Sequence, residues 1–221
     1  MPIEGMLAEM DRCGVEHCIV FGLEGVLGDE TWSNDYVADA VARYPERFTG
    51  LTLVNLNHGA EALQAEMERG FEMGLRGVKL INVYQGHPTE SPLIDVAVEF
   101  CHERDLIVLN HDWGSAQQIE RLCTTYPRAL FITGHANGSY GGVTERVSNL
   151  FISTCPFNSW RRTEQFVELY GADRIVFASD LTDLPVAWGL GPIMYANIPV
   201  ADKRRILGGN LRELLGRYWR R

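Results

Sequence analysis

Short, almost continuously apolar runs alternate along this chain with longer segments in which apolar residues recur every three or four positions. Runs of the first kind are typical of strands covered on both faces, and therefore of parallel sheets. They predict seven strands, at residues 17–21, 48–54, 77–81, 107–110, 130–133, 150–153 and 175–178. Strands that alternate with helices in this way indicate an α/β protein with a parallel sheet.

The segments between the runs predict amphipathic helices whose ends are recognisable. Ser91 followed by Pro92 predicts a helix start, because a serine hydroxyl can accept a bond from a free amide and proline suits the first helical position. Ser115 begins a predicted capping box, Gly171 follows a predicted helix end, and Asn210 is the predicted cap of the last helix. No linker or change of composition divides the chain, so we predict a single domain over residues 1–221.

Two architectures are compatible with this alternation. A doubly wound open sheet usually carries a glycine-rich loop after its first strand, but the glycines of segment 22–28 lack the G-x-G-x-x-G spacing. A (β/α)8 barrel instead carries its functional residues at the ends of several strands. His111, His135 and Asp180 each follow an apolar run, and this pattern favours a TIM-type barrel in which seven strands are recognised.

Charge and composition narrow the range of partners. The formal net charge of -9 disfavours nucleic acid and anionic membranes. No apolar stretch approaches the roughly 20 residues of a membrane helix, and residues 1–5 do not resemble a signal peptide. Cys13, Cys18, Cys101 and Cys123 lie in or beside apolar runs and are interpreted as small buried hydrophobes in a reducing compartment. We therefore predict a cytoplasmic protein that acts on a small molecule and could form a homo-oligomer.

The three residues at the strand ends carry the candidate chemistry. An imidazole at such a position can bind a divalent metal or transfer a proton, which suits His111 and His135. A carboxylate after a buried strand, such as that of Asp180, is costly unless it is paired or bound to a metal. Each residue also has a purely structural alternative. His111 could be a loop histidine bonded to Asp112, and His135 could be a buried histidine bonded to a backbone carbonyl. Asp180 could be a helix cap or a turn aspartate. The coincidence of all three favours a functional site.

Loop residues after the strands are candidates for substrate binding. Trp113 and Asn158 could line the mouth of the site, and Arg161 could grip a carboxylate. The alternative for each is ordinary loop packing. Lys79 is a charged residue in an apolar strand that could be a charge partner or, if carbamylated, a metal ligand, and we favour a lysine whose head reaches water.

Segment 171–180, which reads G-A-D-R-I-V-F-A-S-D, resembles a motif of the amidohydrolase-related family of metal-dependent barrel hydrolases. This family includes aminocarboxymuconate-semialdehyde decarboxylase. The segments 77–80, 131–138 and 203–215 are also similar to it, so the resemblance covers nearly the whole chain.

The resemblance implies a role for each residue at a strand end. His111 and Asp180 would be metal ligands, and His135 would be the acid or base beside the metal, with Asp180 also in the catalytic set. The metal would be zinc, or manganese as in some relatives. A metal-activated water would hydrolyse an amide, lactone or ester of a small carboxylated or cyclic metabolite. The alternatives are a nonoxidative decarboxylase of the same family and a degenerate, non-catalytic barrel that acts as a binding module.

One family feature is missing from the sequence. Members carry a His-x-His or Glu-x-His motif on the first strand, whereas residues 4–10 here look like the helix that precedes the second strand. His111 and Asp180 alone give two strong ligands where a catalytic zinc site normally has three. Three explanations are open: a shortened version of a longer product, which we favour; a degenerate chain; or a partner subunit that supplies the missing strand.

Overall fold

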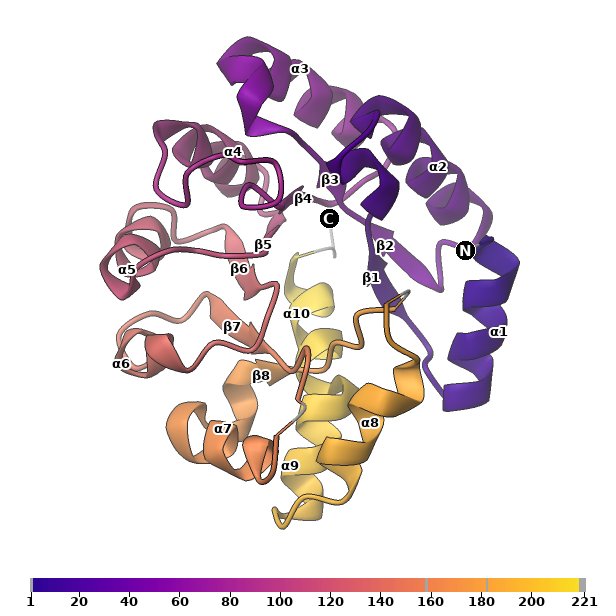
Figure 1. The fold of residues 1–221 in the computed structure, drawn as a ribbon, viewed down its shortest axis with the longest axis vertical. Coiled ribbons are helices and arrows are strands. Elements are labelled where there is room, and N and C mark those ends of the chain that lie inside the picture. Colours follow the sequence, from indigo (N-terminus) through magenta and orange to yellow (C-terminus); the bar gives the residue numbers. More distant parts are fainter. Residues whose placement is uncertain (1, 158, 182, 219–221) are drawn as a thin grey trace. The chain divides into compact units, whose positions relative to one another are not determined.

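Strands and helices alternate throughout the part of the chain that the structure describes, as the apolar pattern predicts (Figure 1). The structure is a computed structural model and describes residues 2–157, 159–181 and 183–218. Its internal contacts divide the chain into two compact units. We call Val15–Ile132 the early-strand unit, and Met1–Gly14 with Thr133–Arg221 the late-strand unit. Each unit is described by itself, and the single domain stays a prediction.

The early-strand unit contains five strands and part of a sixth, separated by helices that lie on the outer side of the strands (Figure 1). The strands are β1 (Cys18–Val20), β2 (Phe48–Gly50), β3 (Thr52–Leu53), β4 (Gly77–Leu80), β5 (Ile107–Asn110) and β6 (Leu130–Thr133). The helices are α2 (Glu30–Arg43), α3 (Gly59–Glu72), α4 (Pro92–Glu103) and α5 (Ala116–Thr125), with short 3-10 turns η1 (Leu23–Val26) and η2 (Leu56–His58).

The predicted strand at residues 48–54 is present as two short strands with different neighbours. β2 pairs with β1 and β3 pairs with β4, both in parallel, and the amide of Leu51 between them donates to the carbonyl of Val20 at 2.8 Å. Gly50 is the last residue of β2, at the point where pairing with β1 ends and pairing with β4 is about to begin. A Cβ atom at this position would come within 2.4 Å of the Leu75 side chain. Only a residue without a side chain allows so close an approach at this point. β4 continues the parallel pairing to β5.

The predicted helix starts are confirmed for α4 and α5. The Ser91 hydroxyl accepts a bond from the amide of Leu93, and the Ser115 hydroxyl accepts one from the amide of Gln118. The capping box at Ser115 is incomplete, however. The Gln118 side chain donates instead to the carbonyls of Thr89 and Trp113, because these acceptors lie within its reach.

In the described part of the chain, the late-strand unit holds two further strands and the remaining helices. They are α1 (Ile3–Cys13), α6 (Gly141–Thr144), β7 (Leu150–Ser153), α7 (Arg162–Tyr170), β8 (Ile175–Val176), α8 (Val186–Met194), α9 (Val200–Arg204) and α10 (Asn210–Tyr218), with 3-10 turns η3 (Gly138–Tyr140) and η4 (Ala172–Arg174) and the π-helical segment η5 (Arg205–Gly209). β7 and β8 pair in parallel. Gly171 follows α7 with a φ of 75°, as a helix end predicts. Within residues 2–17 there is helix α1 and no strand.

Asn210 has a different role from the predicted one. It is the first residue of α10 rather than a cap, and its buried side-chain amide donates to the carbonyls of Ala172 and Ile175, each at 2.7 Å. These carbonyls flank the start of β8, so the side chain ties the last helix to the last strand. The sequence identified the helix start but not the direction of the side chain.

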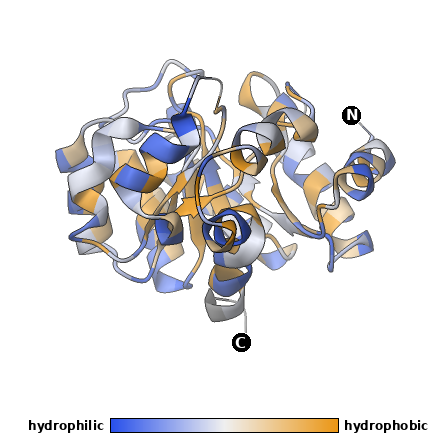
Figure 2. Ribbon diagram, turned by 90° about the horizontal axis from the view of Figure 1, so that it is seen from below, coloured by the Kyte–Doolittle hydropathy of each residue, from blue (hydrophilic) through white to orange (hydrophobic). Residues whose placement is uncertain are grey.

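The strands form the apolar interior of each unit. Figure 2 shows the apolar colouring concentrated on the strand segments, whereas the helices carry both apolar and polar residues. Leu53, Leu80 and Ile107 are completely buried in the early-strand unit, as are Ile152 and Ile175 in the late-strand unit. Among the described residues, no helix combines the length and the hydrophobicity that crossing a membrane requires.

Candidate metal centre

His135 lies in a loop that neighbouring residues of the late-strand unit hold in place. It follows β6 by two residues and is half-buried. The amide of Ala136 donates to the carbonyl of Cys155 at 2.7 Å, and the carbonyl of Asn137 accepts a bond from the Tyr170 hydroxyl. Burial raises the pKa of Tyr170, so this phenol remains a proton donor over a wide pH range. The backbone around the imidazole is therefore fixed on both sides.

Cys155 occupies the corresponding position after β7. Its neighbour Thr154 donates its amide to the carbonyl of Val176 at 3.0 Å, and the Thr154 hydroxyl accepts a bond from the amide of Ala178 at 3.0 Å. The ends of β7 and β8 are thus joined through both backbone and side chain. Cys155 is not part of a disulfide among the described residues, and 2% of its surface is exposed.

Asp180 follows β8 by four residues and has a left-handed backbone, with a φ of 58°. Aspartate adopts this region more readily than most residues. Its carbonyl accepts bonds from the amides of Asp183 and Leu184, at 2.9 and 3.0 Å, so a tight turn begins here. The residue is exposed, and its carboxylate is therefore accessible to a solvated ion.

The side chains of these three residues converge. A ring nitrogen of His135, Sγ of Cys155 and a carboxylate oxygen of Asp180 all lie within 4.8 Å of one another, and Sγ lies 3.8 Å from Nδ1 of His135. Cysteine sulfur and carboxylate oxygen are donors that bind zinc in proteins, and an imidazole beside them can be a further ligand or can transfer a proton. The residues present therefore fit a divalent metal.

Cys155 is the residue that sequence reasoning missed. It follows the apolar run at 150–153 by two residues, as His135 follows the run at 130–133. The same rule of residues at strand ends would have found it. Of the cysteines predicted to be small buried hydrophobes, Cys101 and Cys123 are buried, and burial raises the pKa of both thiols. Cys13 and Cys18 are half-buried, so the prediction is wrong for these two.

His111 lies in the early-strand unit, directly after β5. Its ring is 4.5 Å from the ring of Tyr84, centroid to centroid. The carboxylate of Asp112 accepts a bond from the amide of Gly114 at 2.9 Å. The position at a strand end agrees with the sequence analysis, and the role of His111 as a metal ligand stays a prediction.

The predicted substrate-binding residues have different surroundings. Trp113 has 1% of its surface exposed, and its Nε1 donates to the carbonyl of Ile132 at 3.1 Å, so its placement favours packing over substrate contact. Arg161 is exposed, with its guanidinium over the Trp160 ring at 5.4 Å. Asn158 lies outside the described residues. The expectation that the head of Lys79 reaches water is wrong: the residue is 3% exposed, and its ammonium lies over the ring of Phe21.

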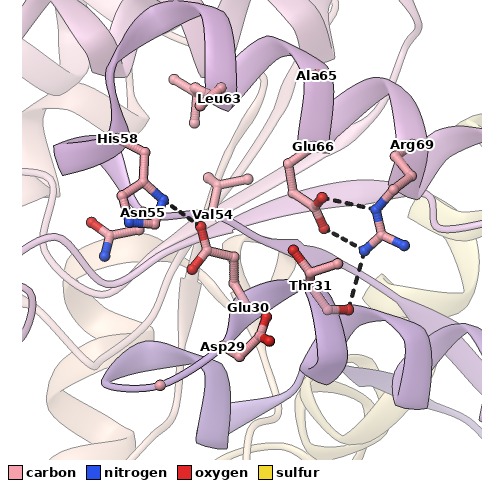
Figure 3. A pocket seen from close by; sticks show the side chains of 12 residues that line it. Asp29, Glu30, Thr31, Val54, Asn55, His58, Leu63, Ala65, Glu66 and Arg69 are labelled. Carbon is pink, nitrogen blue, oxygen red and sulfur yellow. Dashed lines mark hydrogen bonds and ion pairs between the residues drawn. The ribbon is translucent and has the colours of Figure 1, made fainter.

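A separate cavity of about 600 Å³ lies between α2 and α3 in the early-strand unit (Figure 3). Four of its charged or titratable lining residues form two pairs. Nδ1 of His58 is 2.7 Å from a carboxylate oxygen of Glu30, and Glu66 accepts two bonds from the Arg69 guanidinium, at 2.7 and 2.8 Å. The hydrogen bond that Arg69 donates to Glu66 is the main reason why the pKa of Arg69 is raised. None of the predicted site residues lines this cavity.

Comparison with known proteins identifies the class to which this chain belongs. A sequence profile described as amidohydrolase matches residues 20–217, and the chain therefore belongs to the amidohydrolase family. This confirms the resemblance noted in the sequence. No curated protein sequence matched the chain.

Solved structures show the fold. An uncharacterised TIM-barrel protein from Bordetella bronchiseptica is 22% identical, with a TM-score of 0.82 over 98% of this chain and 83% of that one. A 5-carboxyvanillate decarboxylase from Sphingomonas paucimobilis is 20% identical, with a TM-score of 0.71 over 95% and 82% of the two chains. A dihydroxybenzoic acid decarboxylase from a Polaromonas species is 19% identical, with a TM-score of 0.72 over 96% and 85%, and was solved with bound manganese and the inhibitor 2-nitroresorcinol. The predicted TIM-type α/β fold is confirmed.

Proposed function

We propose that this chain is a metal-dependent decarboxylase that removes the carboxylate of a hydroxylated aromatic acid without a redox cofactor. The observation that carries the proposal is the convergence of His135, Cys155 and Asp180 after three successive strands. The two similar structures with a named activity described above are decarboxylases of aromatic acids, and this favours the alternative over the hydrolase that the sequence first suggested.

Asp180 is assigned to the metal, and His111 remains the predicted second ligand. When bound, a divalent cation supplies positive charge that stabilises negative charge on the substrate oxygens. Asp180 suits this task because it is exposed, and because no lysine or arginine in the described part of the chain is paired with its carboxylate. Its negative charge is therefore available to a cation.

His135 is assigned to proton transfer. In a nonoxidative decarboxylation the bond between the ring and the carboxylate breaks, carbon dioxide leaves, and the ring carbon takes up a proton. An imidazole can donate this proton near neutral pH and recover it from water. The bonds of Ala136 and Asn137 fix the loop that carries it, which would keep the proton donor in one position.

The test is release of carbon dioxide from a panel of hydroxybenzoic acids by the purified chain with added zinc or manganese. We expect the corresponding phenol as the second product. His135→Gln should lower kcat by about 10²–10⁴-fold, the usual contribution of a general acid, while the protein still binds metal. A parallel panel of amides, lactones and esters tests the hydrolase. Hydrolysis without carbon dioxide release would overturn the decarboxylase, and inactivity on both panels with metal bound would favour the binding module.

A further inference from the structure

We propose that Cys155 is a metal ligand and that its thiolate makes the site prefer zinc to manganese. The inference rests on the proposed metal-dependent function and adds to it a ligand and the identity of the metal. No role was predicted for this cysteine from the sequence.

The position of the thiol is fixed by the backbone on both sides. Thr154 binds Val176 and Ala178 through its amide and hydroxyl, and the carbonyl of Cys155 itself accepts the amide of Ala136. Residue 155 can therefore move little without breaking bonds to the ends of two neighbouring strands. A ligand held in this way is preorganised, because its backbone is already ordered before the metal arrives.

The distances are compatible with shared coordination. Zinc–sulfur and zinc–oxygen bonds of about 2.3 and 2.1 Å at a tetrahedral angle place the two ligand atoms about 3.6 Å apart. Sγ of Cys155 and a carboxylate oxygen of Asp180 lie within 4.8 Å of each other. Closing the remaining gap requires a shift of about 1 Å on this estimate. Asp180 can supply that shift because its side chain is exposed.

Cys155 also adds to a ligand count that the sequence leaves short. Asp180 is the one predicted metal ligand of the late-strand unit, whereas catalytic zinc sites normally have three from the protein. Cys155 adds a sulfur donor beside the carboxylate oxygen of Asp180. Thiolates favour zinc and other soft metals, whereas carboxylates and water suit manganese.

The surroundings of Cys155 differ from those of an ordinary buried cysteine. Cys101 bonds to the carbonyl of Ile107 within the core, and burial strongly raises its pKa. Sγ of Cys155 instead lies 3.8 Å from an imidazole nitrogen and close to a carboxylate. Cys155 is therefore placed to bind a metal together with the Asp180 carboxylate, and the thiolate is the form of cysteine that binds metal.

The experiment is a titration of the metal-free protein with cobalt(II), a coloured substitute for zinc, followed by competition between zinc and manganese. We expect a thiolate-to-cobalt charge-transfer band in the near ultraviolet at one ion per chain. The band should be absent in Cys155→Ser and present in His135→Gln. Cys13→Ser is the matched control, because it also removes one thiol, lies on α1 and should keep the band.

Zinc affinity should fall in Cys155→Ser by more than the roughly 10–100-fold that loss of an outer-shell partner causes, and manganese affinity should change less. A cobalt complex of the wild-type protein without the band, or unchanged zinc affinity in Cys155→Ser, would overturn the inference. If decarboxylation remained metal-dependent in that case, the proposed function would still stand.

Because Cys155 is buried, its substitution could impair folding. A second measurement therefore uses the wild-type chain alone. Bound zinc should protect Cys155 from alkylation, as read by mass spectrometry of its peptide, and should leave the rate at the half-buried Cys13 unchanged. Equal alkylation of Cys155 with and without bound zinc would contradict direct ligation.

Discussion

Two groups of titratable side chains, one in each unit, differ in how their charges are balanced. Around the cavity of the early-strand unit, Glu30 is paired with His58, and Glu66 with Arg69. In the late-strand unit, the donor atoms of His135, Cys155 and Asp180 converge, and no lysine or arginine among the described residues is paired with Asp180. Carboxylates that already have hydrogen-bond or ion-pair partners stabilise the fold, whereas an exposed carboxylate beside a nitrogen and a sulfur donor is suited to bind a metal cation.

The largest expected effect is a gain in the free energy of unfolding when zinc binds. This gain should depend on the late-strand group and not on the residues of the cavity. Zinc at 100 times its dissociation constant should raise the free energy of unfolding by about 2.7 kcal/mol, because it binds the folded state only. Asp180→Asn should abolish this increase, because the charged ligand is lost. Thermal unfolding with and without zinc measures it. Equal stabilisation of wild type and Asp180→Asn would mean that zinc binds elsewhere. That result would contradict the proposed difference between the two groups of side chains.

A smaller effect is expected in the cavity of the early-strand unit. The two carboxylate oxygens of Glu66 accept hydrogen bonds from Asn34 and Arg69. Glu66→Gln replaces one of these oxygens by an NH2 group, which would face a donor of Asn34 or Arg69. The substitution should therefore lower the free energy of unfolding by about 1–2 kcal/mol. Urea denaturation provides the measurement.

Glu72→Gln is the matched control for Glu66→Gln, because it removes the same charge from the same helix at an exposed position. Zinc affinity should be the same in both variants and in the wild type. A loss of zinc binding in Glu66→Gln alone would show that the cavity takes part in the metal site.

The smallest effect is expected for the partly exposed pair in the same cavity. His58→Gln should cost less than about 1 kcal/mol, as is usual for exposed ion pairs, because half of the His58 side chain is exposed. A double-mutant cycle with Glu30→Gln isolates the interaction. A coupling energy above about 2 kcal/mol would contradict this expectation, because it is typical of a buried charge that needs its partner.

The fold was predictable because parallel strands leave a strong local signal. The predicted strands at 107–110, 130–133 and 150–153 coincide with β5, β6 and β7. The split of the predicted strand at 48–54 was not predictable, because it depends on which neighbour each half pairs with. That choice is made by residues far away in the sequence.

The site was predictable in part. His135 and Asp180 were found because each follows an apolar run, and Cys155 was missed although it also follows one, at residues 150–153. Trp113 looked like a residue of the binding surface, yet it is buried. A sequence shows that a residue lies in a loop after a strand, but not toward which side of the loop its side chain points.

The sequence by itself determined where strands end and which metal-binding or proton-transferring residues follow them. Local hydrophobicity and turn residues are sufficient for this, because each strand is short and buried. Only the tertiary structure decided that His135, Cys155 and Asp180 meet. Their convergence depends on bonds between successive strand ends, from Ser153 to Thr133 and from Thr154 to Ala178. These bonds join residues that are 20 and 24 positions apart in the sequence, and no local pattern encodes them.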